Sequence, residues 1–148
     1  MKIQTKYLGE IQINKDQIIS FPKGLLGFEE HKEFVILGIQ GNELFKFLQD
    51  IHHEYISFLL INPWDFFKDY DIELPDDKLE NISIDPEGNN KMGIYSIVTM
   101  GDDLQNSTCN LLAPIVINLE DKKGKQFVLN NSPYTTKHRL FPEGEESC

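Results

Sequence analysis

The chain has 148 residues, with 14 basic and 24 acidic side chains and a formal net charge of −10. This length fits a single domain with a hydrophobic core of its own. The negative charge disfavours direct binding to nucleic acids and to anionic membranes, because both attract cations. It favours partner proteins that present a basic surface, since opposite fields steer association.

Neither a secretion signal nor a membrane span is predicted. Residues 1–6 lack the apolar core of a signal peptide, and no run approaches the ~18 apolar residues of a membrane helix. The two cysteines, Cys109 and Cys148, show no close spacing of the kind that disulfide frameworks and zinc sites use. We therefore expect a cytoplasmic protein with reduced thiols.

The first 61 residues follow the period of two that is typical of β-strands. Residues 21–29 break this period with two glycines and a proline, and we expect a shaped loop there that is unusually rich in apolar side chains. The expected strands are residues 3–7 and 11–13, which form a hairpin, followed by 18–21, 34–37, 44–49 and 55–61.

Short helical turns are expected next. Asn62 suits a helix cap and Pro63 suits the first helical position, so residues 63–68 are predicted to form a helical turn. Residues 71–74 alternate between polar and apolar side chains, as a strand does. A short helix is expected over residues 76–81.

The remaining elements return to strands. Residues 85–90 are predicted to form a turn, because the segment is rich in Pro, Gly, Asn and Asp. Pro114 interrupts the strand that contains it, which places this strand at an edge or a bulge. The expected strands are residues 93–100, then 108–119 and 125–130, which form a hairpin.

These eight to ten short strands indicate a mainly β protein, either an antiparallel sandwich or a small barrel. No linker divides the chain, so residues 1–140 are assigned to one domain. The acidic tail over residues 141–148 is expected to be frayed and flexible.

Few side chains suggest catalysis or metal binding. His52 and His53 are adjacent, so on a strand they would face opposite ways and could not share one metal. Cys109 lies in an apolar run and is interpreted as a small core residue. Carboxylate pairs are common in this chain, but acid–base catalysis needs a cleft that shifts a pKa. We predict no catalytic residue, metal or cofactor, and keep a small carboxylate-based hydrolase as an alternative.

The negative charge is concentrated in residues 65–87, which hold nine acidic and two basic side chains, a net charge of −7. Acids mixed with aromatic side chains are typical of a docking surface, because aromatics anchor a partner and charges select it. The alternative is that the aromatics belong to the core and the acids simply face water. The aromatic side chains are Trp64, Phe66, Phe67 and Tyr70. The candidate contact residues are Asp69, Tyr70, Asp71, Glu73, Asp76 and Asp77.

Several separated stretches of the chain are each a weak motif, but together, in this order and spacing, they are specific. They are FPKGLLGFE (21–29), FLQ (47–49), NPWDFF (62–67) with Asp69 and Tyr70, TCNLLAPIVIN (108–118) and GKQ (124–126), with Tyr134 beyond them. In this arrangement the chain resembles the FliW family of bacterial flagellar assembly factors over residues 1 to about 139. Leu26 departs from the family, where proline is expected, and so does Cys109, where a small apolar residue is usual.

The resemblance implies a non-enzymatic regulator with a compact, antiparallel β-barrel-like domain. Members of the family bind flagellin and the RNA-binding translational repressor CsrA. Free flagellin holds the factor, and after flagellin export the released factor binds CsrA and relieves repression of flagellin mRNA. Flagellin and CsrA are therefore the expected partners of a protein that is expected to be monomeric, with a flagellin-specific export chaperone as an alternative.

The resemblance also directs attention to apolar residues that could receive flagellin. The terminal segments of flagellin are amphipathic helices before assembly, and such a helix can lie in an apolar groove. One candidate wall is the loop that carries Leu25, Leu26 and Phe28, and another is the strand that carries Leu44 and Phe47. For each of these residues, ordinary core packing is the alternative.

Overall fold

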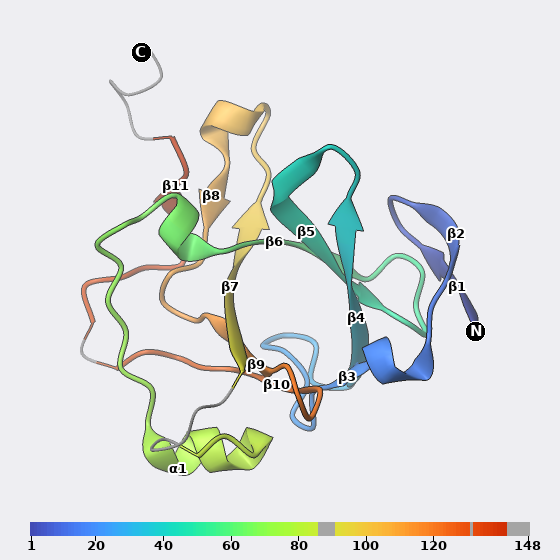
Figure 1. The fold of residues 1–148 in the computed structure, drawn as a ribbon. Helices are drawn as coiled ribbons and strands as arrows, with labels where there is room; N and C mark the ends of the chain where they lie inside the picture. The colour runs from blue at the N-terminus through green and yellow to red at the C-terminus, as the bar shows by residue number, and fades with distance from the viewer. Residues whose placement is uncertain (86–90, 131, 142–148) are drawn as a thin grey trace.

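The structure, a computed structural model, describes residues 1–85, 91–130 and 132–141. Within these residues, seven strands close into a barrel (Figure 1). In ring order they are β7 (Met92–Thr99), β6 (Ser57–Ile61), β5 (Asn42–Asp50), β4 (Glu33–Ile39), β3 (Ile19–Ser20), β10 (Lys123–Gln126) and β9 (Ile115–Asn118). Pairing of β9 with β7 closes the ring. The predicted mainly β, barrel-like fold is confirmed.

One seam of the barrel differs from the expected antiparallel pattern. Strands β3 and β10 run parallel and pair through Ser20 and Lys123, whereas every other neighbouring pair in the ring is antiparallel. The backbone N–H of Ser20 also donates to the carbonyl of Lys122 at 2.9 Å. The first and last strands of the ring meet at this seam.

In the described part of the chain, four more strands lie outside the ring. The hairpin of β1 (Lys2–Thr5) and β2 (Gly9–Gln12) packs on the barrel where Ile3 and Ile13 contact Val35. Beyond β7, β8 (Thr108–Cys109) and β11 (His138–Arg139) extend the sheet. The short helices are η1 (Lys15–Gln17), η2 (Pro63–Asp65), α1 (Asp76–Leu79), η3 (Glu80–Ile82) and η4 (Leu104–Asn106). None of the described helices is long and apolar enough to cross a membrane.

Apolar side chains from most of the barrel strands fill its interior. Phe21 is fully buried and meets Phe34 edge to face, with 5.4 Å between ring centroids. Gly124 lies so close to this ring that a Cβ atom there would be 2.5 Å from two Phe21 carbons. The position therefore excludes any larger residue without repacking. The cluster comprises Ile19, Phe21, Leu25, Phe34, Leu48, Leu60, Ile115 and Ile117.

The expected strand over residues 108–119 is split in the structure. Its first part is β8 and its last part is β9. The backbone leaves the sheet after Cys109 and rejoins it at Ile115, directly after Pro114, which has no N–H to donate. Its predicted partner over residues 125–130 ends as a strand at Gln126, although Phe127 still donates its backbone N–H to the Pro114 carbonyl at 2.9 Å. The predicted hairpin is thus present as β9 and β10, but both strands are shorter than predicted.

Two further predictions concern residues near the barrel. Residues 71–74 form no strand, yet their exposure alternates as the sequence pattern predicts, because the segment is extended with one side against the barrel. The helix predicted over residues 76–81 is present as α1 followed by η3. Residues 86–90 of the predicted turn cluster and residues 142–148 of the predicted tail lie outside the described residues.

Candidate partner-binding surface

A long connection between β6 and β7 crosses one side of the molecule, and we call its residues 62–84 the strap. In Figure 1 it runs in green from η2 to α1. Its first turn forms where expected: the side-chain oxygen of Asn62 accepts the Trp64 backbone N–H at 3.0 Å, and Pro63 occupies the first helical position. This cap fixes the direction in which the chain leaves the barrel.

Aromatic side chains attach the strap to the barrel. The buried Tyr70 hydroxyl donates to the Leu111 carbonyl at 2.6 Å, and the Trp64 indole N–H donates to the Tyr70 carbonyl at 2.8 Å. The Tyr70 ring meets Tyr134 edge to face, with 4.7 Å between centroids. Burial, and secondarily the neighbouring Tyr134 and Cys109, raise the pKa of Tyr70 above its usual value. The phenol therefore stays protonated and acts as a donor.

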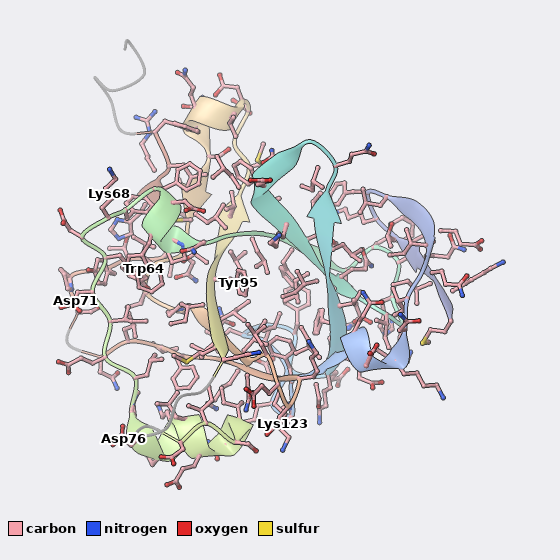
Figure 2. All side chains as sticks on the ribbon, viewed as in Figure 1. Trp64, Lys68, Asp71, Asp76, Tyr95 and Lys123 are labelled. Carbon is pink, nitrogen blue, oxygen red and sulfur yellow. The ribbon has the colours of Figure 1, made fainter. Side chains whose placement is uncertain are left out.

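The acidic side chains of the strap face the opposite way, into solvent. Figure 2 shows Lys68, Asp71 and Asp76 at the outer edge of the strap. Seven exposed acids lie on the strap beside two lysines, a net charge of −5, and none of the seven forms an ion pair with a described residue. They are Asp65, Asp69, Asp71, Glu73, Asp76, Asp77 and Glu80. Tyr70 thus belongs to the core, Trp64, Phe66 and Phe67 are half-buried against it, and the acids face solvent.

Two of the cavities that border the strap lie along its middle, residues 66–73. The larger, of about 420 Å³, is lined by Phe66, Phe67, Lys68, Asp69, Tyr70, Leu111, Tyr134 and His138. The second, of about 330 Å³, is lined by Asp71, Ile72, Glu73, Leu129, Asn130, Ser132 and Pro133. The two are linked by a hydrogen bond in which the Asp71 backbone N–H donates to the Tyr134 hydroxyl at 2.8 Å. Both cavities therefore combine carboxylates with an apolar or aromatic wall.

The structure separates the candidate residues of the apolar loop. Leu25 is 2% exposed and belongs to the barrel interior, so its side chain offers no outer surface. Leu26 is 55% exposed, and its backbone N–H donates to the Gln126 side chain at 2.9 Å. Phe28 is half-buried and meets Phe58 edge to face. At this loop the candidate apolar surface therefore depends on Leu26.

Leu44 and Phe47 of β5 do not form one wall. Residues three apart on a strand point to opposite faces of the sheet. Leu44 is exposed and lines a small cavity with Tyr95 and Asp65, beside the start of the strap. Phe47 is half-buried beneath the N-terminal hairpin, where its ring stacks on Tyr7 with 4.8 Å between centroids. The two residues are therefore separate surface features.

Cys109 is fully buried in the cluster that anchors the strap. Burial raises the pKa of its thiol to about 12. A thiol with this pKa remains protonated at neutral pH and is not a nucleophile. Its role is packing, as the sequence indicates.

Tyr134 and His138 contribute to the larger cavity but were absent from the candidate residues. They lie more than 60 residues beyond Tyr70, and their rings reach the cavity because β11 returns the chain to β8. The sequence carries no local signal for this approach. The only indication of Tyr134 was its place in the family resemblance.

Comparisons with known proteins agree over nearly the whole chain. The family model described as FliW protein matches residues 2–140. The flagellar assembly factor FliW of Anoxybacillus flavithermus is 44% identical over 147 residues, covering 99% of both chains. That of Bacillus subtilis is 41% identical over 148 residues and covers 100% of both. A crystal structure of the flagellar assembly factor FliW matches with a TM-score of 0.90 and 42% identity, covering 97% of this chain and 99% of that one.

Proposed function

The chain belongs to the FliW family of flagellar assembly factors, and from this premise we propose that it acts by exchanging two protein partners, flagellin and CsrA. In this proposal, free flagellin occupies the factor. Once flagellin is exported, the factor binds CsrA and relieves its repression of flagellin mRNA. The exchange takes place in the cytoplasm and involves no chemical transformation.

The observation that carries this proposal is the acidic face of the strap. CsrA binds RNA and must present basic residues, so an acidic surface suits it as a partner. The carboxylates of the strap have no ion pair with a described residue, so no internal interaction has to break when a basic partner approaches. Complementary fields mainly raise the rate of association and select the partner.

Flagellin needs a different surface, because its terminal helices are amphipathic. The cavity of about 420 Å³ offers aromatic walls from Phe67 and Tyr134 close to the acidic Asp69. An amphipathic helix could place its apolar face on these rings. Leu26 and Leu44, which are 55% and 47% exposed, are further candidate contacts.

The proposal is tested with purified CsrA and a charge-reversed strap. The variant Asp69→Lys, Asp71→Lys and Glu73→Lys is compared with a control that makes the same charge change elsewhere, Asp16→Lys, Glu54→Lys and Glu120→Lys. All six carboxylates are exposed, so both variants should fold. We expect the strap variant to associate with CsrA at least about tenfold more slowly at low salt, and the control to keep most of the wild-type rate.

The outcomes separate the alternatives. Wild-type association that slows as salt rises supports the proposal, because screening at 0.15 M confines a surface field to about 8 Å. Equal losses in both variants would remove the strap from the mechanism. If the protein binds flagellin but not CsrA, the result favours the export chaperone. If it binds neither protein, the result favours the carboxylate-based hydrolase.

A further inference from the structure

A second cluster of chemically active side chains lies away from the strap. His31 stands two residues before β4, Asp50 ends β5, and His53 lies in the turn that follows. His31 Nδ1 is 2.6 Å from Asp50 Oδ2, and the His31 and His53 rings meet edge to face with 4.6 Å between centroids. One ligand atom from each of the three residues lies within 4.8 Å of the other two.

The carboxylate of this cluster is fixed before any ligand arrives. Asp50 is 1% exposed, and its Oδ1 accepts the backbone N–H groups of His52 and His53 at 2.7 and 3.2 Å. These bonds hold Oδ1 and leave Oδ2 directed at His31. The only ion-pair partner of Asp50 among the described residues is His31. A buried carboxylate with so little cationic compensation is a ready ligand for a cation.

The two histidines are positioned by packing and remain accessible. The Phe28 ring meets His31 edge to face, with 5.9 Å between centroids, and limits its rotation. The His31 side chain is 21% exposed, and His53 is exposed. Both imidazoles are therefore open to solvent, and the two rings, which are in contact, must move apart for an ion to reach the buried Asp50.

The geometry points to a binding site for a divalent late first-row transition ion, Zn²⁺ in the first place, held by His31, Asp50 and His53. Imidazole and carboxylate are ligands that suit such ions. Zinc bonds of about 2.0–2.2 Å in a tetrahedron require ligand atoms about 3.3 Å apart, so small side-chain rotations suffice. The fourth position faces solvent and takes water.

Metal binding replaces the hydrogen bond between His31 and Asp50. Nδ1 of His31 binds an ion through its lone pair, so in the bound state the proton of the neutral imidazole lies on Nε2.

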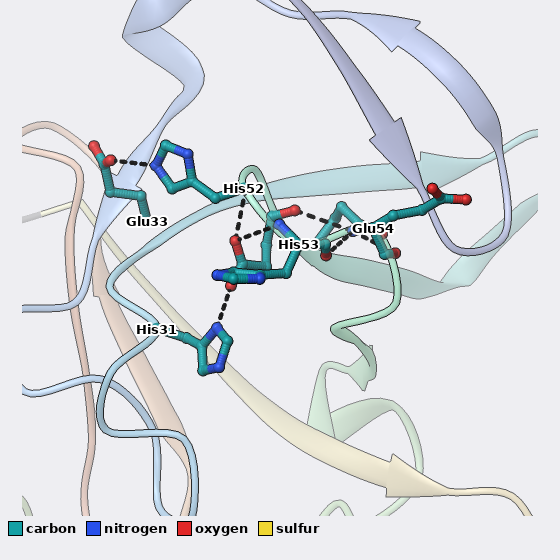
Figure 3. A network of polar contacts seen from close by, with 7 residues as sticks. His31, Glu33, His52, His53 and Glu54 are labelled. Atoms are coloured by element: carbon teal, nitrogen blue, oxygen red, sulfur yellow. Dashed lines mark hydrogen bonds and ion pairs between the residues drawn. The ribbon is translucent and has the colours of Figure 1, made fainter.

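His52 provides a matched control within the same turn. Figure 3 shows His52 directed to Glu33, away from His31. The His52 Nε2 to Glu33 Oε1 distance is 2.8 Å, and both side chains are about half exposed. Replacing His52 removes an imidazole beside the site without removing a proposed ligand.

The test is calorimetric titration of the untagged protein with ZnCl₂, supported by the visible absorption of bound Co²⁺. We expect one equivalent to bind wild type and His52→Ala with similar affinity. His53→Ala and Asp50→Asn should each lose at least about tenfold in affinity. The Asn variant is isosteric, and its side-chain oxygen can still accept the backbone N–H groups of His52 and His53. Circular dichroism checks the fold of all variants.

The outcomes decide the proposal, and they are independent of flagellin and CsrA. Zinc-dependent elevation of Tm in wild type and His52→Ala, absent in His53→Ala, supports the site because a ligand bound only by the folded state stabilises it. Three results would overturn it: absence of saturable binding, equal loss in His52→Ala and His53→Ala, or binding that none of the substitutions weakens.

Discussion

The barrel and the strap are stabilised by different kinds of contact. In the barrel, a closed ring of backbone hydrogen bonds surrounds fully buried side chains such as Phe21. The strap has no strand partner among the described residues, and buried side chains such as Tyr70, Leu79 and Ile82 attach it to the barrel. Its outer acids contribute no described ion pair to either region. The fold thus separates residues that determine stability from residues that are free to face a partner.

The largest effect should come from the barrel interior. Replacing Phe21 by alanine leaves a cavity against Phe34 and Gly124, and we expect a loss of about 3–5 kcal/mol in the free energy of unfolding. Urea denaturation measures this loss. Leu26→Ala, five residues along and exposed, should change stability by no more than about 0.5 kcal/mol. Similar losses at both positions would contradict the assignment of interior and surface.

Alkaline pH should weaken the contact between barrel and strap. The Cys109 thiol has a pKa of about 12 when folded, against an ordinary 9.0, so between these values the folded state keeps a proton that the unfolded state loses. The stabilisation is complete below pH 9 and falls by about 1.4 kcal/mol per pH unit toward pH 12. Tyr70 adds a loss of the same sign. Urea denaturation at several pH values gives the free energy of unfolding as a function of pH. This free energy should fall less steeply with pH in Cys109→Ala than in wild type, and an equal fall in both would refute the contribution of the thiol.

The attachment of the strap should be weaker than the barrel. Tyr70→Phe leaves the buried Leu111 carbonyl without its donor, and we expect a loss of about 1–3 kcal/mol. Hydrogen exchange should accelerate in residues 66–74 before it does so in β4 or β5. Tyr134→Phe removes only the acceptor of the Asp71 N–H, at an exposed site, and should cost less. Uniform acceleration across the barrel would show that the two regions unfold together.

The smallest effect on stability should come from the acids of the strap. Asp69→Asn, Asp71→Asn and Glu73→Gln should each change the free energy of unfolding by no more than about 0.5 kcal/mol, because all three are exposed and without described ion pairs. Thermal denaturation at low and high salt measures this. A loss of several kcal/mol would assign these acids to the fold and not to a partner.

The sequence predicted the ring strands well because each has one face in a common core. The apolar side chains that predict β5 and β7 include those that the fold buries, such as Phe45, Leu48 and Val98. It failed for residues 108–119, where an apolar run continues although residues 110–114 belong to no strand. Hydrophobicity reports burial and not hydrogen bonding, so the split into β8 and β9 was not visible.

The candidate site was predicted less completely, for a related reason. The sequence located the acids of the strap, whose exposure follows from their charge. It did not separate Leu25 from Leu26, which are identical side chains with opposite environments. Nor did it predict that His31 and His53 are in contact, because this contact depends on the register in which β4 and β5 pair. Contacts between distant segments have no local signature.

The parallel seam between β3 and β10 has a consequence for synthesis on the ribosome. Ser20 in β3 pairs with Lys123 in β10, so about a hundred residues must be synthesised after β3 before the ring can close. Until then, β3 is an edge strand of an open sheet, and its unpaired backbone groups can pair with other chains. A nascent chain arrested before residue 123 should therefore be protease-sensitive and dependent on chaperones, and release of β10 should end that vulnerable interval.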